Sequence, residues 1–397
     1  MIARKLFLLA MLVAPAAHGA EPWQLLPSAK AARAALVSPG AIEAVRVALA
    51  PGAFEAQTAT LDLSLTDGQR VRAFRASSDW RAPDDYTWVG WVDGDPEQQV
   101  TLTRVGEHLA AHLSVDQGIY ELTPTRDGAL LMRIDTQRFP QCGGADEVPH
   151  GFHDETRTVN APDGTITIDV LIVVSPSSTA QLGGQPQARA FAQSAVDSAN
   201  TAYQNSLMQA RLRLAGVRFT TRADSGNSAT DLSWLRSNAE VAGWRNQVGA
   251  DMVGMISEFS NSCGQGYLMG SPPGAGFAPN AYQVSARSCA VGNLTYAHEH
   301  GHNMGFQHDP GNGSGAAFPY AYGHFVDGSY RTVMSYSTGC AAGCARRPYF
   351  SNPNVAFMGA ATGIVDQRDN ARAGNQTAAI VAAFRAEAVS LFVDGFE

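Results

Sequence analysis

The chain has 397 residues, a length that accommodates two or three domains. Charged residues make up 16% of it, the formal net charge is −8, and neither a basic stripe nor a long run of like charge is present, so we expect no nucleic-acid partner. Its 39 glycines are typical of a loop-rich exported protein.

The first 20 residues have the organisation of a secretory signal peptide. Arg4 and Lys5 precede an apolar run at 6–13, and small residues then lead to a predicted cleavage near Gly19 or Ala20. The run is too short to span a bilayer, and no later segment reaches the necessary length. We therefore expect a secreted protein, extracellular or periplasmic, with no membrane span. An uncleaved N-terminal anchor is the alternative.

Residues 21–160 form the second predicted domain, which is rich in β-structure. Leu109, Ala111 and Leu113 alternate with other residues at the period of two that a half-buried strand requires. Turn signals such as Asp116-Gln-Gly separate the strands and predict an antiparallel meander. The segment resembles the prodomains of reprolysin-like proteases, which implies a propeptide. A substrate-binding module is the competing interpretation.

A polar segment at 145–164 lacks periodicity and predicts the linker at which a propeptide would be cut, with Arg157 as one candidate site. The third predicted domain, 161–397, opens near Thr165 on a β-branched run fit for a buried strand. The elements expected along it are a strand at 166–174, a helix from Pro186, a strand at 212–219, a helix at 232–239, a strand at 251–256, a substrate-holding edge strand at 282–285 and a packing helix at 380–391.

One short segment holds the pattern H-E-x-x-H-x-x-G-x-x-H, formed by His298, Glu299, His302, Gly305 and His308. On a helix, His298 and His302 share a face and can bind one ion, while Glu299 lies about 100° around the axis from His298. Gly305 tolerates the left-handed conformation that ends helices, so the chain can turn back and bring His308 to the same ion. The pattern predicts a Zn²⁺ site with an open fourth position.

The predicted chemistry is hydrolysis. Zinc bound by three neutral imidazoles lowers the pKa of a bound water towards about 7 and polarises a carbonyl. Glu299 would accept the proton of that water and pass it to the leaving amine. The alternative is a solvated polar helix with many histidines. His300, which lies between the ligands in sequence, is predicted to face elsewhere and not to coordinate.

Residues 331–336 read Arg-Thr-Val-Met-Ser-Tyr. The zinc pattern followed by Met334 resembles the metzincin clan of zinc endopeptidases. The resemblance implies an α/β catalytic domain, with a mixed twisted sheet and a zinc-binding helix, that acts on protein or peptide substrates and follows a mainly β prodomain. Met334 would be the apolar floor of the site.

Two further residues point to different branches of that clan. Asp309, directly after the third histidine, resembles the reprolysin or adamalysin branch. Tyr336 instead resembles the serralysin and astacin arrangement, in which a tyrosine binds zinc or steadies the oxyanion. The branch stays open at this point, and an ordinary core tyrosine is the alternative for Tyr336.

Five cysteines fit an oxidising compartment. Four lie in the C-terminal half, and proximity in sequence favours the disulfides Cys263–Cys289 and Cys340–Cys344, although three pairings are possible. Cys142 is the odd residue. If its region is a propeptide, its thiolate would occupy the open zinc position, which resembles the cysteine switch of metzincin zymogens. The propeptide would then be the enzyme's own inhibitor; an unpaired thiol, or a different disulfide set, is the alternative.

The resemblance also implies that the segment after Met334 forms a substrate pocket. Arg346 and Arg347 lie there and would attract an acidic side chain by bidentate pairing, and this stretch resembles bacterial peptidyl-Asp metalloendopeptidases. Two solvated surface arginines are the alternative. For the whole chain, the rivals to a peptidase are a zinc hydrolase acting on cell-wall or other non-protein material and a non-catalytic zinc module. An intact Glu299 argues against the last, because a structural zinc site needs no base.

Overall fold

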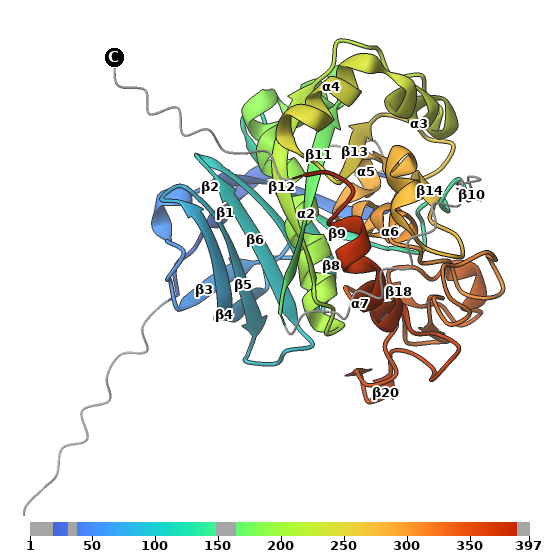
Figure 1. Cartoon of the computed structure of the whole chain (residues 1–397). Helices are drawn as coiled ribbons and strands as arrows, with labels where there is room; N and C mark the ends of the chain where they lie inside the picture. Colours follow the sequence, from blue (N-terminus) through green and yellow to red (C-terminus); the bar gives the residue numbers. More distant parts are fainter. Residues whose placement is uncertain (1–18, 31–37, 148–163, 387–397) are drawn as a thin grey trace, which may run out of the picture.

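The computed structural model describes residues 19–30, 38–147 and 164–386 (Figure 1). The predicted signal peptide, the candidate cleavage site Arg157 and the last part of the predicted C-terminal helix lie outside these ranges. Among the described residues, no helix is both long enough and apolar enough to span a membrane.

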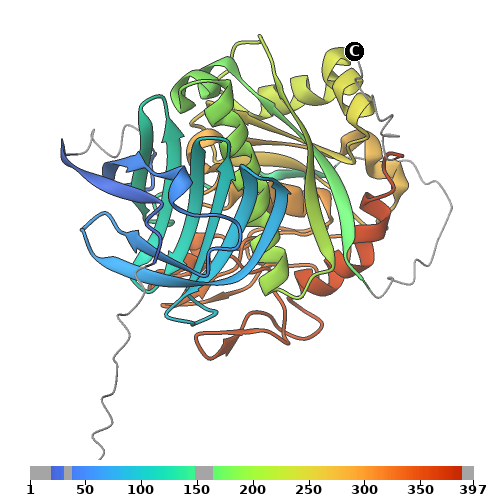
Figure 2. The same cartoon turned by 90° about the vertical axis from the view of Figure 1, so that its left-hand side faces the viewer.

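A nine-stranded sheet, here called the N-terminal sheet, is built from the first part of the chain. Its strands are β1 (Trp23–Lys30), β2 (Ala41–Leu49), β3 (Thr60–Ser64), β4 (Arg70–Ala82), β5 (Asp85–Val92), β6 (Gln99–Val105), β7 (His108–Val115), β8 (Gly118–Thr125) and β9 (Gly128–Ile134). They pair antiparallel throughout in the order β1-β2-β9-β8-β7-β6-β5-β4-β3. The sheet curves around its own core, which includes Trp88, Leu102 and Leu122 (Figure 2). The predicted meander is confirmed.

A six-stranded mixed sheet supports the second half of the molecule. Its strands are β10 (Ala145–Glu147), β11 (Ile166–Val174), β12 (Ala210–Phe219), β13 (Met252–Ser257), β14 (Gly264–Leu268) and β15 (Tyr282–Ala286), in the order β10-β14-β15-β13-β11-β12. β14 runs antiparallel to β15, and the other pairs are parallel. The apolar run 170–174 of β11 is buried inside the sheet, as expected for a parallel strand.

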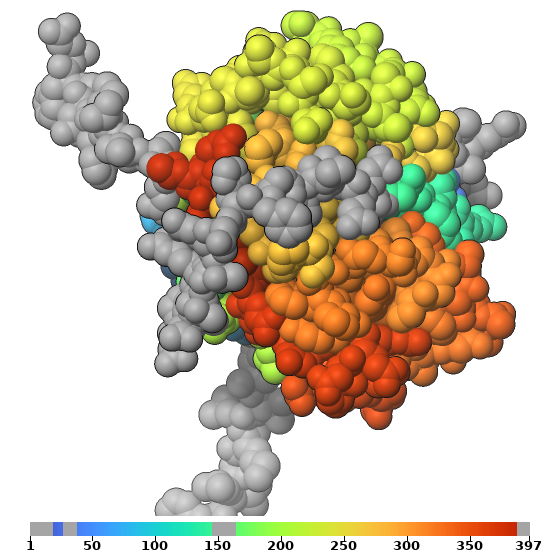
Figure 3. All heavy atoms as spheres, turned by 45° about the vertical axis from the view of Figure 1, so that its right-hand side comes forward, coloured from blue at the N-terminus to red at the C-terminus, as the bar shows by residue number. Residues whose placement is uncertain are grey.

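The prediction that 282–285 is the edge strand is wrong. β15 lies inside the sheet, between β13 and β14. On its other side β14 pairs with β10, which is the edge strand. Sequence reasoning missed β14 because Gly264 and Gly266 remove the side-chain pattern that marks a strand. The outer side of β14 is paired with β10, so three residues placed in the linker are in fact a strand. In Figure 3 the turquoise segment that includes β10 lies on the surface beside gold and orange parts of the chain.

Seven α-helices occur among the described residues: α1 (Pro176–Leu182), α2 (Gln185–Asn205), α3 (Ser228–Ser237), α4 (Ala239–Val248), α5 (Arg287–Ala290), α6 (Thr295–Asn303) and α7 (Asn370–Val381). The single helix predicted at 232–239 is two helices, because the Asn238 side chain accepts a hydrogen bond from Val241 N and starts α4 where α3 ends. The helix predicted at 380–391 begins earlier, at Asn370, because the Asp369 side chain caps α7 there. It ends at Val381, before Phe384.

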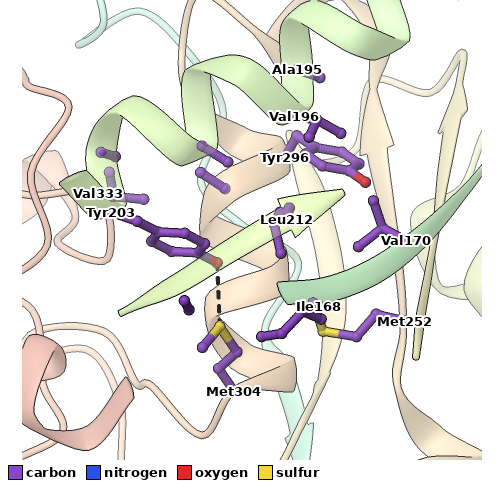
Figure 4. Packing of buried hydrophobic residues seen from close by; sticks show 14 of the residues in the cluster. Ile168, Val170, Ala195, Val196, Tyr203, Leu212, Met252, Tyr296, Met304 and Val333 are labelled. Carbon is purple, nitrogen blue, oxygen red and sulfur yellow. Dashed lines mark hydrogen bonds between the residues drawn. The ribbon is translucent and has the colours of Figure 1, made fainter. Parts of the chain in front are cut away.

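Helix α2 lies between the N-terminal sheet and the mixed sheet (Figure 1). One face is apolar: Tyr203 and Ala195 pack in the core that also contains α6, and the Tyr203 hydroxyl donates to Met304 Sδ at 3.3 Å (Figure 4). The opposite face contacts the N-terminal sheet through buried polar groups. Asp197 accepts hydrogen bonds from Thr87 at 2.5 Å and from Thr103 at 2.6 Å. This part of the contact between the two units is polar, whereas elsewhere Ile134 of the N-terminal sheet and Val284 of the mixed sheet belong to one buried apolar cluster.

After α6 the chain forms short strands and long loops. The strands are β16 (Phe325–Val326), β17 (Tyr330–Arg331), β18 (Ala345–Arg346), β19 (Ala356–Phe357) and β20 (Ala360–Ala361), and three-residue or six-residue 3₁₀ helices occur at Pro51–Ala53, Ala275–Asn280 and Ser337–Gly339. The structure contains the disulfides Cys263–Cys289 and Cys340–Cys344, with Cα–Cα distances of 5.6 and 5.8 Å, which is the pairing predicted from sequence proximity. Among the described residues Cys142 is the free cysteine.

Candidate active site

Helix α6 and the turn after it place three imidazoles together. His298 and His302 lie one turn apart on α6, which ends at Asn303. Gly305 then adopts φ +88°, and a Cβ atom there would collide with Ala317. This left-handed residue turns the chain so that the His308 ring faces the other two. The Nε2 atoms of His302 and His308 are 3.1 Å apart, and those of His308 and His298 are 3.2 Å apart.

These separations fit a tetrahedral zinc ion. Two imidazole nitrogens at zinc-bonding distance lie about 3.3 Å apart in that geometry. The Cys142 Sγ atom completes the group: the four ligand atoms of Cys142, His298, His302 and His308 all lie within 4.8 Å of one another. The residues present are therefore a Cys-His₃ donor set, with three donors from the α6 region and the fourth from the segment after β9.

Backbone carbonyls fix the orientation of all three rings. The Nδ1 atom of His298 donates to Val333 O at 2.8 Å, and that of His302 donates to Phe306 O at 2.8 Å. His308 Nδ1 lies 3.3 Å from Asn312 O. A proton on Nδ1 leaves the Nε2 lone pair free for a metal, so the second shell selects the tautomer that a zinc site needs.

Glu299 points its carboxylate at the same place. Its Oε2 atom accepts from the Cys142 thiol at 3.4 Å, and its Oε1 atom is buried without a hydrogen-bond partner. The carboxylate fits because β14 is bare here, since a Cβ at Gly264 would lie 2.5 Å from Glu299 Oε1. A buried carboxylate with one oxygen unsatisfied has the position expected of a base that awaits a reactant.

The electrostatics favour neutral groups unless a cation is bound. Burial lowers the pKa of His302 to about 4 and keeps the rings of His298 and His308 neutral as well. Burial raises the pKa of Glu299 to about 8, and burial together with Glu299 raises the pKa of the Cys142 thiol. A divalent cation among these groups would reverse both anionic shifts, so the chemistry of the donor set fits a metal.

The segment 332–336 forms one wall of the site. Met334 is fully buried, and a Cβ at Gly301 would lie 2.5 Å from its Sδ atom, so the sulfur packs against α6. The Tyr336 ring stands against His308, with centroids 4.1 Å apart, and its hydroxyl donates to Cys142 O at 3.3 Å. Asp309 accepts from Tyr336 N at 3.0 Å, which links the third histidine to this wall.

The two predicted pocket arginines separate. Arg346 is 5% exposed and lies beside the site, where its Nη1 atom donates to Asn293 O at 2.9 Å. Arg347 points away and donates to Ser114 Oγ of the N-terminal sheet at 3.0 Å. Sequence reasoning missed Arg331, which is buried next to Arg346. The available signal was its place at the start of the segment that carries Met334.

His300 faces away from the three ligand rings, as predicted, but it is not solvated. It is fully buried against Tyr296, with ring centroids 4.6 Å apart, and burial lowers its pKa to about 3. The alternative of a solvated helix is therefore wrong, since every residue of α6 is buried.

Comparison with known proteins connects this geometry to a family. A family model described as metallo-peptidase family M12 matches residues 164–351, which contain all three histidines. A peptidyl-Asp metalloendopeptidase of Stenotrophomonas maltophilia (strain R551-3) is 33% identical over 349 residues, which cover 80% of this chain and 81% of that protein. The chain belongs to this family of metallopeptidases. It is a zinc-dependent metalloendopeptidase.

Other relatives of the peptidase carry the same name. The protein of Stenotrophomonas maltophilia (strain K279a) is 32% identical over 349 residues, with 80% of this chain and 81% of that protein covered. The protein of Xanthomonas campestris pv. campestris (strain ATCC 33913) is 31% identical over 352 residues, with 82% of each chain covered. Because 164–397 is less than 60% of the peptidase, these similarities also extend into the N-terminal region.

Proposed function

We propose that the peptidase is an exported endopeptidase that is made as a zymogen and that cuts proteins beside acidic residues. The observation that carries this proposal is the convergence of three histidines, one carboxylate and one thiol, in which the thiol comes from a different part of the chain. The predicted signal peptide supports export, and the name shared by the relatives supports the substrate class.

In this proposal His298, His302 and His308 hold the zinc ion. When bound, zinc supplies an acidified water and polarises the scissile carbonyl. Glu299 takes a proton at its carboxylate and returns it to the leaving amine. Its buried Oε1 atom has no hydrogen-bond partner and is free for this role. The Tyr336 hydroxyl donates a hydrogen bond to developing negative charge once Cys142 O no longer accepts it.

The N-terminal sheet and the segment to Glu147 are the propeptide in this proposal. Cys142 places its sulfur 3.9 Å from His302 Nε2 and 3.4 Å from Glu299 Oε2, where it keeps water away from the base. β10 pairs with the outer side of β14, so the same segment also covers the strand edge on which an extended peptide would pair. Latency thus has a chemical part and a steric part.

The test of the catalytic assignment uses processed protein loaded with zinc. Wild type is expected to cut casein-like protein and a mixed peptide library, and a chelator is expected to abolish cutting. Glu299→Gln is expected to retain stoichiometric zinc and lose at least about a thousandfold in kcat, because it loses the base. Glu240→Gln, an exposed carboxylate on α4, is the matched control and keeps full activity. Zinc-loaded wild type that leaves every substrate uncut would refute the proposal.

The test of latency compares full-length wild type with full-length Cys142→Ala before any processing. The variant is expected to show activity that wild type lacks, because the fourth donor has gone. After processing, the two should be equal, since the cut removes residue 142. Equal latency of the two full-length proteins would remove the thiol from the inhibitory mechanism.

A further inference from the structure

Two arginines stand side by side under the site, and neither has a carboxylate partner. Arg331 and Arg346 are register partners in the parallel pair β17–β18, and they are 2% and 5% exposed. No ion pair involves either of them within the described ranges, 19–30, 38–147 and 164–386. A buried cation without an anion is costly, so such pairs are concentrated at functional sites.

Main-chain oxygens hold both guanidinium groups in place. Ser335 O accepts from Arg331 Nε at 3.2 Å and from Arg346 Nη2 at 3.4 Å. Cys344 O accepts from Arg331 Nη1 at 2.8 Å. The Arg346 Nε atom is buried without any partner. The pair is therefore rigid, positively charged and incompletely satisfied.

The pair is adjacent to the catalytic groups. Ser335, which both guanidinium groups share, lies between Met334 and Tyr336 in the chain. Tyr336 in turn stands against the ring of His308, with centroids 4.1 Å apart. A side chain next to the scissile bond would thus come within reach of the two guanidinium groups.

In the full-length chain, oxygen atoms of the N-terminal region accept hydrogen bonds from the two arginines. Thr136 O accepts from Arg331 Nη2 at 2.9 Å, and Thr136 Oγ1 lies 3.4 Å from Arg331 Nη1. The same hydroxyl accepts from Arg346 N at 2.9 Å. The negative charge that acts on Arg331 belongs to the neighbouring Asp135, which opposes the lowering of its pKa by burial and by Arg346. All these groups would leave with the propeptide.

We propose that Arg331 and Arg346 form the subsite that recognises the acidic side chain of the substrate, and that Thr136 blocks it until the propeptide leaves. This inference rests on the proposed function. A carboxylate would replace the two Thr136 oxygens, pair with the fork of Arg331 and neutralise part of the buried charge. Arg347, the other arginine singled out in the sequence, has no part in it.

The experiment uses processed zinc enzyme and three peptides that differ at one position beside the scissile bond, which holds Asp, Asn or Ala. Wild type is expected to favour Asp over Asn by at least about tenfold in kcat/KM, because a site built to pair a group rejects the analogue without it. Arg331→Gln and Arg346→Gln are each expected to remove most of that preference, measured within each variant as the ratio of kcat/KM for the Asp peptide to kcat/KM for the Asn peptide. Arg347→Gln, the matched control, keeps the preference.

A binding measurement separates this inference from the proposed function. In the non-cleaving Glu299→Gln background, calorimetry is expected to show tighter binding of the Asp peptide than of the Asn peptide, and a loss of the difference on adding Arg331→Gln. Arg331→Lys keeps the positive charge but lacks the two-pronged guanidinium group, so it should retain part of the difference in binding. A preference unchanged in both glutamine variants, or wild type without preference, overturns the subsite. Failure to cleave any peptide refutes the catalytic proposal, while the binding difference still tests the arginine pair.

Discussion

At the scale of single residues, Asp309 links the zinc ligands to the wall that carries Tyr336. Its carboxylate accepts from Ser335 Oγ at 3.1 Å, Tyr336 N at 3.0 Å and Asn312 Nδ2 at 2.7 Å, and it is 2% exposed. Three donors around one buried carboxylate hold the turn in a single conformation.

We predict that Asp309→Ala lowers the free energy of unfolding by about 2–4 kcal/mol, because a buried backbone N–H and a hydroxyl lose their acceptor. Asp309→Asn keeps one acceptor oxygen and should cost less. Denaturant unfolding of the zinc-loaded protein measures both. A loss below about 0.5 kcal/mol for the alanine variant would show that water replaces the carboxylate at little cost.

A second residue-scale prediction concerns pH. His112 is buried between Thr101 and Glu121 in the N-terminal sheet, and burial, with a smaller contribution from Arg347, lowers its pKa from 6.5 to about 4. The folded state therefore prefers the neutral ring. Its contribution to stability is complete above pH 6.5 and is lost as the pH falls from 6.5 towards 4.

Glu121 lies opposite His112, and its titration has the opposite effect on stability. Burial raises the pKa of its carboxyl, so its contribution to stability is lost as the pH rises. We therefore predict a change in the slope of the unfolding free energy against pH rather than in its absolute value. His112→Gln should reduce the loss of unfolding free energy between pH 6 and 5 by up to about 1.4 kcal/mol per pH unit, one proton's worth. Denaturant titrations of the full-length chain at each pH give the slopes, and identical slopes would exclude His112 as the titrating group.

At the scale of elements, the end of α6 decides whether the third histidine reaches the ion. Gly305 has φ +88° and no room for a Cβ. We predict that Gly305→Ala lowers stability by about 2 kcal/mol or more and weakens zinc binding, because the left-handed conformation and the contact with Ala317 both become unfavourable. Competition with a zinc chelator measures the binding.

The matched control is another glycine substitution in a different helix. Gly243 lies inside α4, is exposed, and a Cβ there would meet no atom within 4 Å. Gly243→Ala should raise stability by about 0.5–1 kcal/mol, because alanine is the better helix former, and should leave zinc binding unchanged. If both substitutions had the same sign, backbone conformation would not be the reason for Gly305.

At the scale of the whole molecule, the N-terminal sheet and the mixed sheet meet through polar groups on α2, through the donor Cys142 and through a buried apolar cluster that includes Ile134 and Val284. The polar groups of this contact can exchange their partners for water after separation, whereas the apolar cluster would become exposed hydrophobic surface. The Asp197 carboxylate with its Thr87 and Thr103 partners belongs to the polar part of the contact, since each group can exchange its partner for water.

We predict that the fourth donor changes zinc retention as well as activity. Full-length wild type should release zinc to a chelator about tenfold or more slowly than full-length Cys142→Ala, since a bound thiolate adds a ligand. A metal-indicator dye follows the release without any substrate. Equal rates would mean that the sulfur lies near the ion but does not bind it.

Much of the fold could be predicted where one element carries its own pattern. The antiparallel meander, the buried strand β11 and the helix α2 follow from periodicity and turn residues. Residues at 145–147 could not be assigned as a strand, and β15 could not be placed inside the sheet, because each depends on β14, whose two glycines carry no pattern.

The sequence by itself determined the three imidazoles and the carboxylate, because they lie within eleven residues and helix geometry with one glycine decides how they meet. The tertiary structure alone decided which arginines flank them. Arg331 replaces Arg347 beside Arg346, and it meets Thr136, 195 residues earlier, through the packing of two sheets. Contacts of that range depend on how whole surfaces fit together, and local residue patterns carry no record of them.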